Sequence, residues 1–72
     1  MRPARRTRRR DAEATKARIL RAAVRHFGEY GYEGASLRNI LRDADASLAS
    51  ANYHFGTKAE LLRAAIDRYM VQ

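Results

Sequence analysis

The stretch from Ser36 to Lys58, SLRNILRDADASLASANYHFGTK, decides the fold. Ser36 can cap a helix, because its hydroxyl can accept a hydrogen bond from a free N–H of the first turn. Asp45 can end this helix, since Asp tolerates the left-handed conformation of a sharp turn, and Ser47 can cap a second helix that reaches about Tyr53 or His54. Two short helices joined by a tight turn predict a helix-turn-helix. The apolar residues of its first helix recur at helical spacing, at Leu37, Ile40, Leu41 and Ala44.

A longer helix is predicted after this motif. Gly56 suits a helix C-terminus, and Thr57 and Glu60 have the spacing of a capping box, in which Glu60 reaches back to the Thr57 N–H. The helix from Lys58 to Gln72 has an apolar face wider than three short partner helices need, and the pattern runs to the end of the sequence. We therefore expect the helix to continue, or to pack on something absent from this chain. The face is made by Leu61, Leu62, Ala65, Ile66, Tyr69 and Met70.

The residues before the motif predict a first helix from Ala12 to Tyr30, ended by Gly31. His26 is expected at its surface or boundary, and Tyr32 is expected to cover the core. With the three later helices, this gives an all-α fold, a small bundle of about four helices. The expected core consists of Ile19, Leu20, Ala23, Val24, Phe27, Leu37, Ile40, Leu41, Ala51, Phe55, Leu61, Leu62 and Ala65.

Charge is concentrated at the N-terminus. The net charge of the 72 residues is +7, and the six arginines among the first ten residues supply +6 of it. Residues 1–11 have no apolar periodicity and include Pro3, so we predict a disordered basic arm. The arm indicates a polyanionic partner, nucleic acid first and an anionic membrane surface second. The alternative is a solvated tail that only aids solubility.

Composition argues against several classes of protein. The chain has no cysteine, two histidines, no glycine-rich phosphate loop and no carboxylate pair with a plausible shared pocket. A chain this short also has little room for a cleft. We therefore predict no enzyme activity, no metal site and no cofactor. No apolar run approaches the roughly 20 residues of a membrane helix, so no membrane-spanning segment is expected, and the predicted partner is DNA and not a membrane.

The chain resembles the N-terminal DNA-binding domain of TetR-family transcriptional repressors, over about Thr15 to Met70. The resemblance implies that residues 12–72 form a TetR-type helix-turn-helix domain of a cytoplasmic, bacterial repressor. It implies binding to inverted-repeat operators in double-stranded DNA by a homodimer. The C-terminal domain that binds an effector and dimerises in this family is absent here, so we expect a monomer or weak dimer. The matching stretches are ILRAAVRHF (19–27), YGYEGAS (30–36), LRNI (37–40) and YHFGTKAELL (53–62).

Three positions depart from the family pattern. Asp45 stands where the family usually has the turn glycine, and Ala46 replaces a larger apolar residue, usually valine. Asn52 stands where a phosphate-contacting tyrosine is common. The sequence therefore leaves open which of Asn52, Tyr53 and His54 reaches DNA.

The predicted DNA readers lie on the helix-turn-helix. A recognition helix, here Ser47 to Tyr53, contacts base edges in the major groove mainly with its N-terminal residues. Ala51 is expected in the core, which leaves Ser47, Leu48, Ala49, Ser50 and Asn52 for the groove. Leu48 suits a thymine methyl, although it could instead face the core. Arg38 can span O6 and N7 of one guanine, although an exposed arginine or a phosphate contact is the alternative.

The predicted phosphate contacts are more numerous. Ser36 and Thr57 cap helix N-termini, where free N–H groups and the helix dipole favour an anion. Lys58 adds a full charge, and Tyr53 and His54 can donate hydrogen bonds. The arm is predicted to add phosphate or minor-groove contacts through Arg5, Arg6, Arg8 and Arg9.

Two other functional classes fit part of the sequence. One is a helical protein-interaction module whose basic tail binds polyanions non-specifically. The other is a cationic membrane-active peptide, which would need a basic amphipathic helix that the arginine segment lacks. Titration against duplex DNA at two salt concentrations would discriminate among the three classes.

Overall fold

The protein is described by a computed structural model that covers the backbone of residues 4–69 and the side chains of residues 11–69. Four helices follow one another over this range: α1 (Ala4–Gly34), α2 (Leu37–Ala44), α3 (Leu48–His54) and α4 (Lys58–Tyr69). The predicted all-α bundle of four helices is therefore confirmed. Predictions that involve residues 1–3 and 70–72, including Met70 on the last helix, fall outside the described residues.

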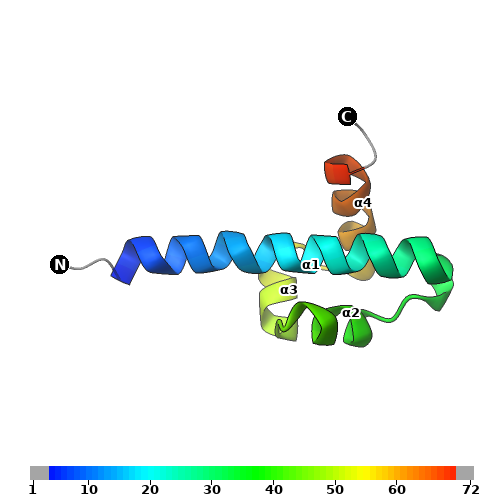
Figure 1. Cartoon of the computed structure of the whole chain (residues 1–72), viewed down its shortest axis with the longest axis horizontal. Helices are drawn as coiled ribbons and strands as arrows, with labels where there is room; N and C mark the ends of the chain where they lie inside the picture. The colour runs from blue at the N-terminus through cyan, green and yellow to red at the C-terminus, as the bar shows by residue number, and fades with distance from the viewer. Residues whose placement is uncertain (1–3, 70–72) are drawn as a thin grey trace.

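Helix α1 organises the domain. It contacts each of the other three helices. In Figure 1, α2 and α3 lie on one side of α1, and α4 crosses it and ends on the other side. The N-terminal part of α1, drawn in blue, projects past the rest of the domain.

The start of α1 corrects the sequence prediction. We expected an irregular arm over residues 1–11 and a helix from Ala12, but the helix begins at Ala4. Arginine and alanine are both among the strongest helix formers, so this segment can be helical without an apolar stripe. The predicted end at Gly31 is found as a break in the backbone, where φ is 76° and ψ is 173°. Helical hydrogen bonding then resumes and ends at Gly34.

The caps and the turn of the helix-turn-helix form as predicted. Ser36 and Ser47 cap α2 and α3 with their side-chain oxygens. Asp45 adopts the left-handed conformation, with φ 55° and ψ 49°, and its N–H bonds back to the carbonyls of Arg42 and Leu41. Gly56 also has positive φ, at 100°, and separates α3 from α4.

The core is smaller than the sequence predicts. Five expected core residues are only half-buried, namely Val24, Phe27, Leu37, Phe55 and Leu62. Three alanines outside the expected set, Ala22, Ala35 and Ala44, are buried instead, because small side chains let helices approach closely. Val24, Phe27 and Leu62 border an apolar hollow between α1 and α4 that also involves Gly28, Ala65 and Ile66. Ile66 is 36% exposed, so part of the broad apolar face of α4 is uncovered among the described residues.

Candidate nucleic-acid interface

Helix α3 presents one face to the core and the other to solvent. The Ser50 N–H donates to Ser47 Oγ at 3.1 Å, which fixes the first turn. Ala51 is buried, as predicted, and holds α3 against the domain. Leu48 is 56% exposed and Tyr53 is 83% exposed, so the alternative that Leu48 belongs to the core is excluded. The exposed residues of this segment are Ser47, Leu48, Ala49, Asn52 and Tyr53, whereas Ser50 and His54 are half-buried.

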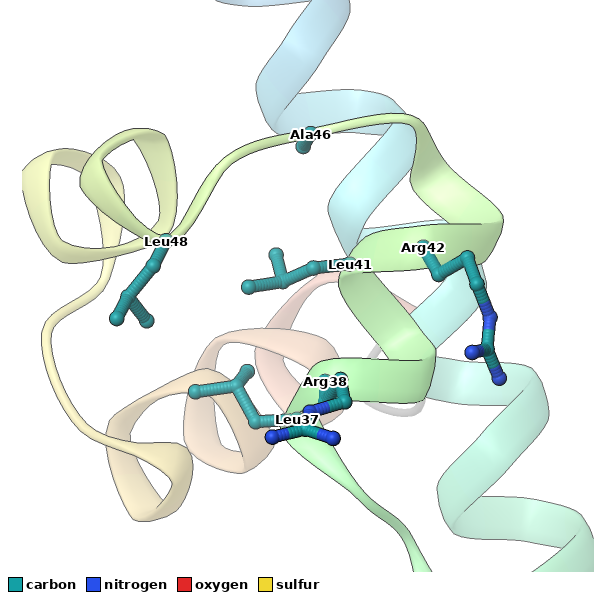
Figure 2. A pocket seen from close by; sticks show the side chains of 6 residues that line it. All are labelled: Leu37, Arg38, Leu41, Arg42, Ala46 and Leu48. Carbon is teal, nitrogen blue, oxygen red and sulfur yellow. The ribbon is translucent and has the colours of Figure 1, made fainter.

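A hollow of about 400 Å³ separates α2 from α3, and we call it the α2–α3 hollow. Its lining residues are Leu37, Arg38, Leu41, Arg42, Ala46 and Leu48. Figure 2 shows that the leucine side chains converge on one space from the two helices. Ala46 contributes only a methyl group to its wall, where a larger residue would occupy part of the space. The structure thus brings together Arg38 and Leu48, two predicted DNA readers from different helices.

The sequence reasoning missed Arg42. This residue lies four positions after Arg38, one helical turn later on α2, and lines the same hollow. Its Nη2 donates to Asn39 Oδ1 at 2.5 Å, which holds the guanidinium along the exposed side of α2. The four-residue spacing between the two arginines is a signal that could have identified it, because residues four apart share a helix face.

A second hollow lies between α1 and α3. It is lined by Asp11, Ala12, Thr15, Ala49, Ser50, Tyr53 and His54. The rings of Tyr53 and His54 meet edge to face, with centroids 5.0 Å apart. Because both residues line this hollow, the two predicted phosphate donors lie beside the part of α1 that follows the arginine-rich segment. The side chains of Arg5, Arg6, Arg8 and Arg9 lie outside the described residues.

The capping box at the start of α4 is confirmed, and it changes what this helix end can offer a phosphate. The Thr57 N–H donates to Glu60 Oε1 at 2.9 Å, and the Glu60 N–H donates to Thr57 Oγ1 at 3.1 Å. The Thr57 backbone amide is therefore already paired. The Thr57 hydroxyl also donates to Glu60 Oε1, at 3.4 Å, so what remains for an anion at this position is the ammonium group of Lys58.

The cap of α2 is similar. Ser36 Oγ accepts a hydrogen bond from the Asn39 N–H at 3.3 Å, so the hydroxyl proton is available to a phosphate oxygen. Ser36 lines a different hollow from Arg38, together with Asn39, Arg42 and residues of α1. Arg42 lines both hollows and so lies between the two predicted contacts.

Two sets of polar side-chain contacts join α2 to α1. Arg18 Nε donates to the Ala44 carbonyl at 2.8 Å, at the C-terminal end of α2. His26 Nε2 lies 2.6 Å from Asp43 Oδ2, and Arg25 Nη2 donates to the same oxygen at 3.2 Å. The hydrogen bond with His26 is the main cause that lowers the pKa of the Asp43 carboxyl; desolvation opposes it, and the hydrogen bond with Arg25 adds a smaller lowering effect. His26 is only 8% exposed, so the predicted surface or boundary position was wrong. Its imidazole can be buried because Asp43 of α2 supplies a polar partner.

Residues 19–65 match the family model described as bacterial regulatory proteins, tetR family. The chain belongs to the TetR family. It is 39% identical over 62 residues to the HTH-type transcriptional repressor SCO4008 of Streptomyces coelicolor. These 62 residues are 86% of this chain and 32% of that protein. It is 38% identical over 61 residues to the uncharacterized HTH-type transcriptional regulator YezE of Bacillus subtilis, covering 85% of this chain and 31% of that protein.

A third TetR-type relative is the HTH-type transcriptional regulatory protein RaaS of Mycobacterium tuberculosis. It is 43% identical over 56 residues, which is 78% of this chain and 26% of that protein. The chain thus spans about a third or less of the length of these relatives. No solved structure matches the chain significantly.

Membership of the TetR family defines the domain's role. The chain is the helix-turn-helix DNA-binding domain of a transcriptional regulator, and the family is not one of enzymes. No helix within residues 4–69 is long and apolar enough to cross a membrane. Among the described side chains, no group of three or more metal-ligating residues could hold an ion.

Proposed function

We propose that this TetR-type domain binds an inverted-repeat operator in double-stranded DNA as part of a transcriptional repressor, with α3 in the major groove. The observation that carries this proposal is the α2–α3 hollow, where Arg38 and Leu48 flank one apolar space (Figure 2). A guanidinium group beside an apolar hollow suits the major-groove edge of DNA, which presents hydrogen-bond acceptors and the methyl group of thymine. The SCO4008 relative, whose name describes a transcriptional repressor, supports the assignment to repression.

The hollow suits two neighbouring bases. The Arg38 guanidinium can donate to O6 and N7 of one guanine, which Lys cannot do with the same planar fork. Leu48, 56% exposed, can cover the C5-methyl group of a thymine, with Leu37 and Ala46 behind it. We therefore propose a guanine and a thymine in close proximity within each half-site. Ser50 can hydrogen-bond several base edges, and Asn52 can pair with adenine or hold a phosphate.

Phosphate contacts fix the domain on the duplex without reading sequence. Ser36 can donate through its hydroxyl, since its oxygen accepts a backbone hydrogen bond within the cap. The Thr57 hydroxyl donates to Glu60 Oε1 at 3.4 Å, so it would have to exchange this partner for a phosphate oxygen. Tyr53 is exposed and can reach a phosphate directly, with His54 beside it. Lys58 supplies a full charge at the start of α4.

The arginine-rich segment is proposed to strengthen binding through Arg5, Arg6, Arg8 and Arg9. Its backbone continues α1 away from the hollow between α1 and α3, so it leaves the domain near the proposed recognition helix. Arginines in such a position can bind phosphates or enter the minor groove, which is most negative in A-tracts.

The proposed oligomeric state rests on the greater length of the relatives. A repressor that binds an inverted repeat needs two copies, with half-sites about 10 base pairs or more apart. The relatives are about three times as long as this chain, so we assign dimerisation of the whole regulator to the remaining part. The domain alone is expected to be a monomer or weak dimer, with lower operator affinity than the whole protein.

The test compares base reading with phosphate binding. Operators are first selected from random duplexes with the domain, and affinities are measured by fluorescence anisotropy. Arg38→Ala should lose about 1–3 kcal/mol at one base pair and relax the preference there, whereas Lys58→Ala should weaken all sequences about equally. Arg21→Ala, an exposed change on α1, is the matched control for lost positive charge.

Two results would contradict the proposal. If Arg38→Ala weakens selected and random DNA alike, Arg38 is a phosphate contact. If the parent domain binds selected and random duplexes equally, the alternative of a protein-interaction module with a polyanion-binding tail gains support.

A further inference from the structure

The ring of Tyr32 contacts both an aromatic ring and a cation. Tyr32 stacks on Phe27, with ring centroids 6.0 Å apart and planes inclined by 18°. Lys58 Nζ lies over the Tyr32 ring, 4.5 Å from its centroid. Phe27 is itself packed against the buried core. Tyr32 is therefore in contact both with a residue packed on the core and with an ammonium group at the start of α4.

We propose that Tyr32 is a positioning residue for DNA binding, because its ring holds the Lys58 ammonium group in place for a phosphate. This inference rests on the proposed function, in which Lys58 contacts the DNA backbone. Tyr32 was expected only to cover the core. Its position instead links the core directly to a proposed phosphate-binding charge.

A neutral ring suits this purpose better than a carboxylate would. A lysine is drawn to the face of an aromatic ring by the ring quadrupole, and its positive charge is not cancelled. A paired carboxylate would neutralise the ammonium and repel an approaching phosphate. The carboxylate of Glu60, two residues along, is bound instead to the Thr57 N–H within the capping box.

The backbone fixes the ring independently of DNA. Gly31, with φ 76°, breaks α1 one residue before Tyr32 and lets the chain turn back, and the Ala35 N–H donates to the Gly31 carbonyl at 3.0 Å. A side chain at position 31 would be strained in this conformation. The ring that follows this turn contacts both Phe27 and Lys58. A free lysine loses considerable rotamer entropy when a phosphate immobilises it, and a lysine that is already held loses less.

The experiment is a double-mutant cycle on operator affinity. Tyr32→Leu removes the ring, Tyr32→Phe keeps it, and Lys58→Ala removes the cation. We expect Tyr32→Leu to weaken binding about two- to fivefold per domain, the range expected for an exposed cation–π contact, and Tyr32→Phe to bind like the parent. In the Lys58→Ala background, Tyr32→Leu should cause no further loss. Tyr30→Leu, a change of another exposed tyrosine on α1, is the matched control.

Two further readouts separate positioning from a general structural role. The slope of log K against log salt should fall by about 0.9 in Lys58→Ala and stay unchanged in Tyr32→Leu, because only the first variant removes a charge. In the free parent domain, the NMR signals of the Lys58 ε-methylene protons should be shifted upfield by the ring, and this shift should vanish in Tyr32→Leu. The NMR measurement on the parent needs no variant to fold.

Several outcomes would overturn the inference. It is wrong if the losses from Tyr32→Leu and Lys58→Ala simply add, if the parent has no upfield shift at Lys58, or if Lys58→Ala binds operator as tightly as the parent. Failure of the proposed function looks different: the parent would then fail to prefer selected operator over random duplex, while the NMR shift at Lys58 persisted.

Discussion

Arg18 should contribute more to the stability of this domain than any other surface arginine with a described side chain. It is half-buried on α1, and its Nε donates to the Ala44 carbonyl at 2.8 Å, where α2 ends. Its Nη2 also reaches the Asp45 carbonyl at 3.4 Å, within the turn of the helix-turn-helix. We predict that Arg18→Met strongly destabilises the domain, because methionine keeps the long apolar part of the side chain but removes every hydrogen-bond donor.

The expected magnitude follows from the surroundings of the acceptor. Ala44 is 2% exposed, so its carbonyl has little access to water if Arg18 is lost. A buried acceptor left without its charged donor costs about 1–3 kcal/mol, and we take about 2 kcal/mol for Arg18→Met. A domain of this size has a total stability of only roughly 3–5 kcal/mol. The melting temperature should then fall by about 8–16 °C.

Urea unfolding followed by circular dichroism measures this directly. The control is Arg21→Met, the same substitution three residues later on α1, at an exposed position. Arg18→Met should lower the urea midpoint with an unchanged slope, while Arg21→Met should stay within about 0.5 kcal/mol of the parent. Equal midpoints for the two variants would refute the claim that the Ala44 carbonyl depends on Arg18.

Three further predictions concern other parts of the chain. Phe27→Ala should cost about 2–3 kcal/mol, less than the 3–5 kcal/mol of a fully buried phenylalanine, because Phe27 is only partly buried; a variant that melts like the parent would contradict this. Asp43→Asn should destabilise the domain above pH 3.8, the ordinary pKa of the carboxyl. The difference in unfolding free energy between variant and parent should shrink as the pH falls below that value, because the pKa of Asp43 is lowered in the folded state. Urea midpoints measured across the acid range test the direction of this change. Deleting residues 1–10 should flatten the slope of log K against log salt by about 2.7 if roughly three arginines bind phosphate. A loss that is larger with A·T-rich flanking DNA would indicate minor-groove entry, a loss independent of the flanks would indicate electrostatics alone, and an unchanged slope would leave the arm as a solubility tail.

The helix-turn-helix was predictable because its signals are local. Ser36, Ser47 and Thr57 each cap a helix within three residues of their own position. Asp45 adopts the left-handed turn through its own backbone preference. Such features depend on a few neighbouring residues, so a single sequence is enough to place them.

Contacts between helices were not predictable in the same way. Arg18 and the Ala44 carbonyl are 26 residues apart, and His26 and Asp43 are 17 apart. A helical pattern shows which face a residue lies on, but not which polar group a neighbouring helix will present there. His26 was therefore predicted at the surface or boundary, whereas its bond to Asp43 allows it to be buried.

The candidate site was predicted in part. The sequence predicted Ala51 in the core and favoured Leu48 in the groove, with the core as its alternative, but it did not predict that Leu48 and Arg38 would share one hollow. Their juxtaposition depends on the angle between α2 and α3, which the turn fixes. The DNA contacts of both residues remain predictions. The apolar pattern did not decide where α1 begins, because the arginine-rich segment has no apolar stripe and helix propensity alone can extend a helix that is already nucleated.

The three helix caps form within the chain itself, and this affects the thermodynamics of DNA binding. Ser36, Ser47 and Thr57 each already accept a backbone N–H of their own helix, so α2, α3 and α4 do not need DNA to complete their first turns. Operator binding by residues 36–69 should therefore be close to rigid-body docking. Its heat-capacity change should reflect only the apolar surface covered at the interface, without the larger negative value of coupled folding. Because these helices lose little conformational entropy on binding, more of the interaction free energy is left for discriminating one base sequence from another.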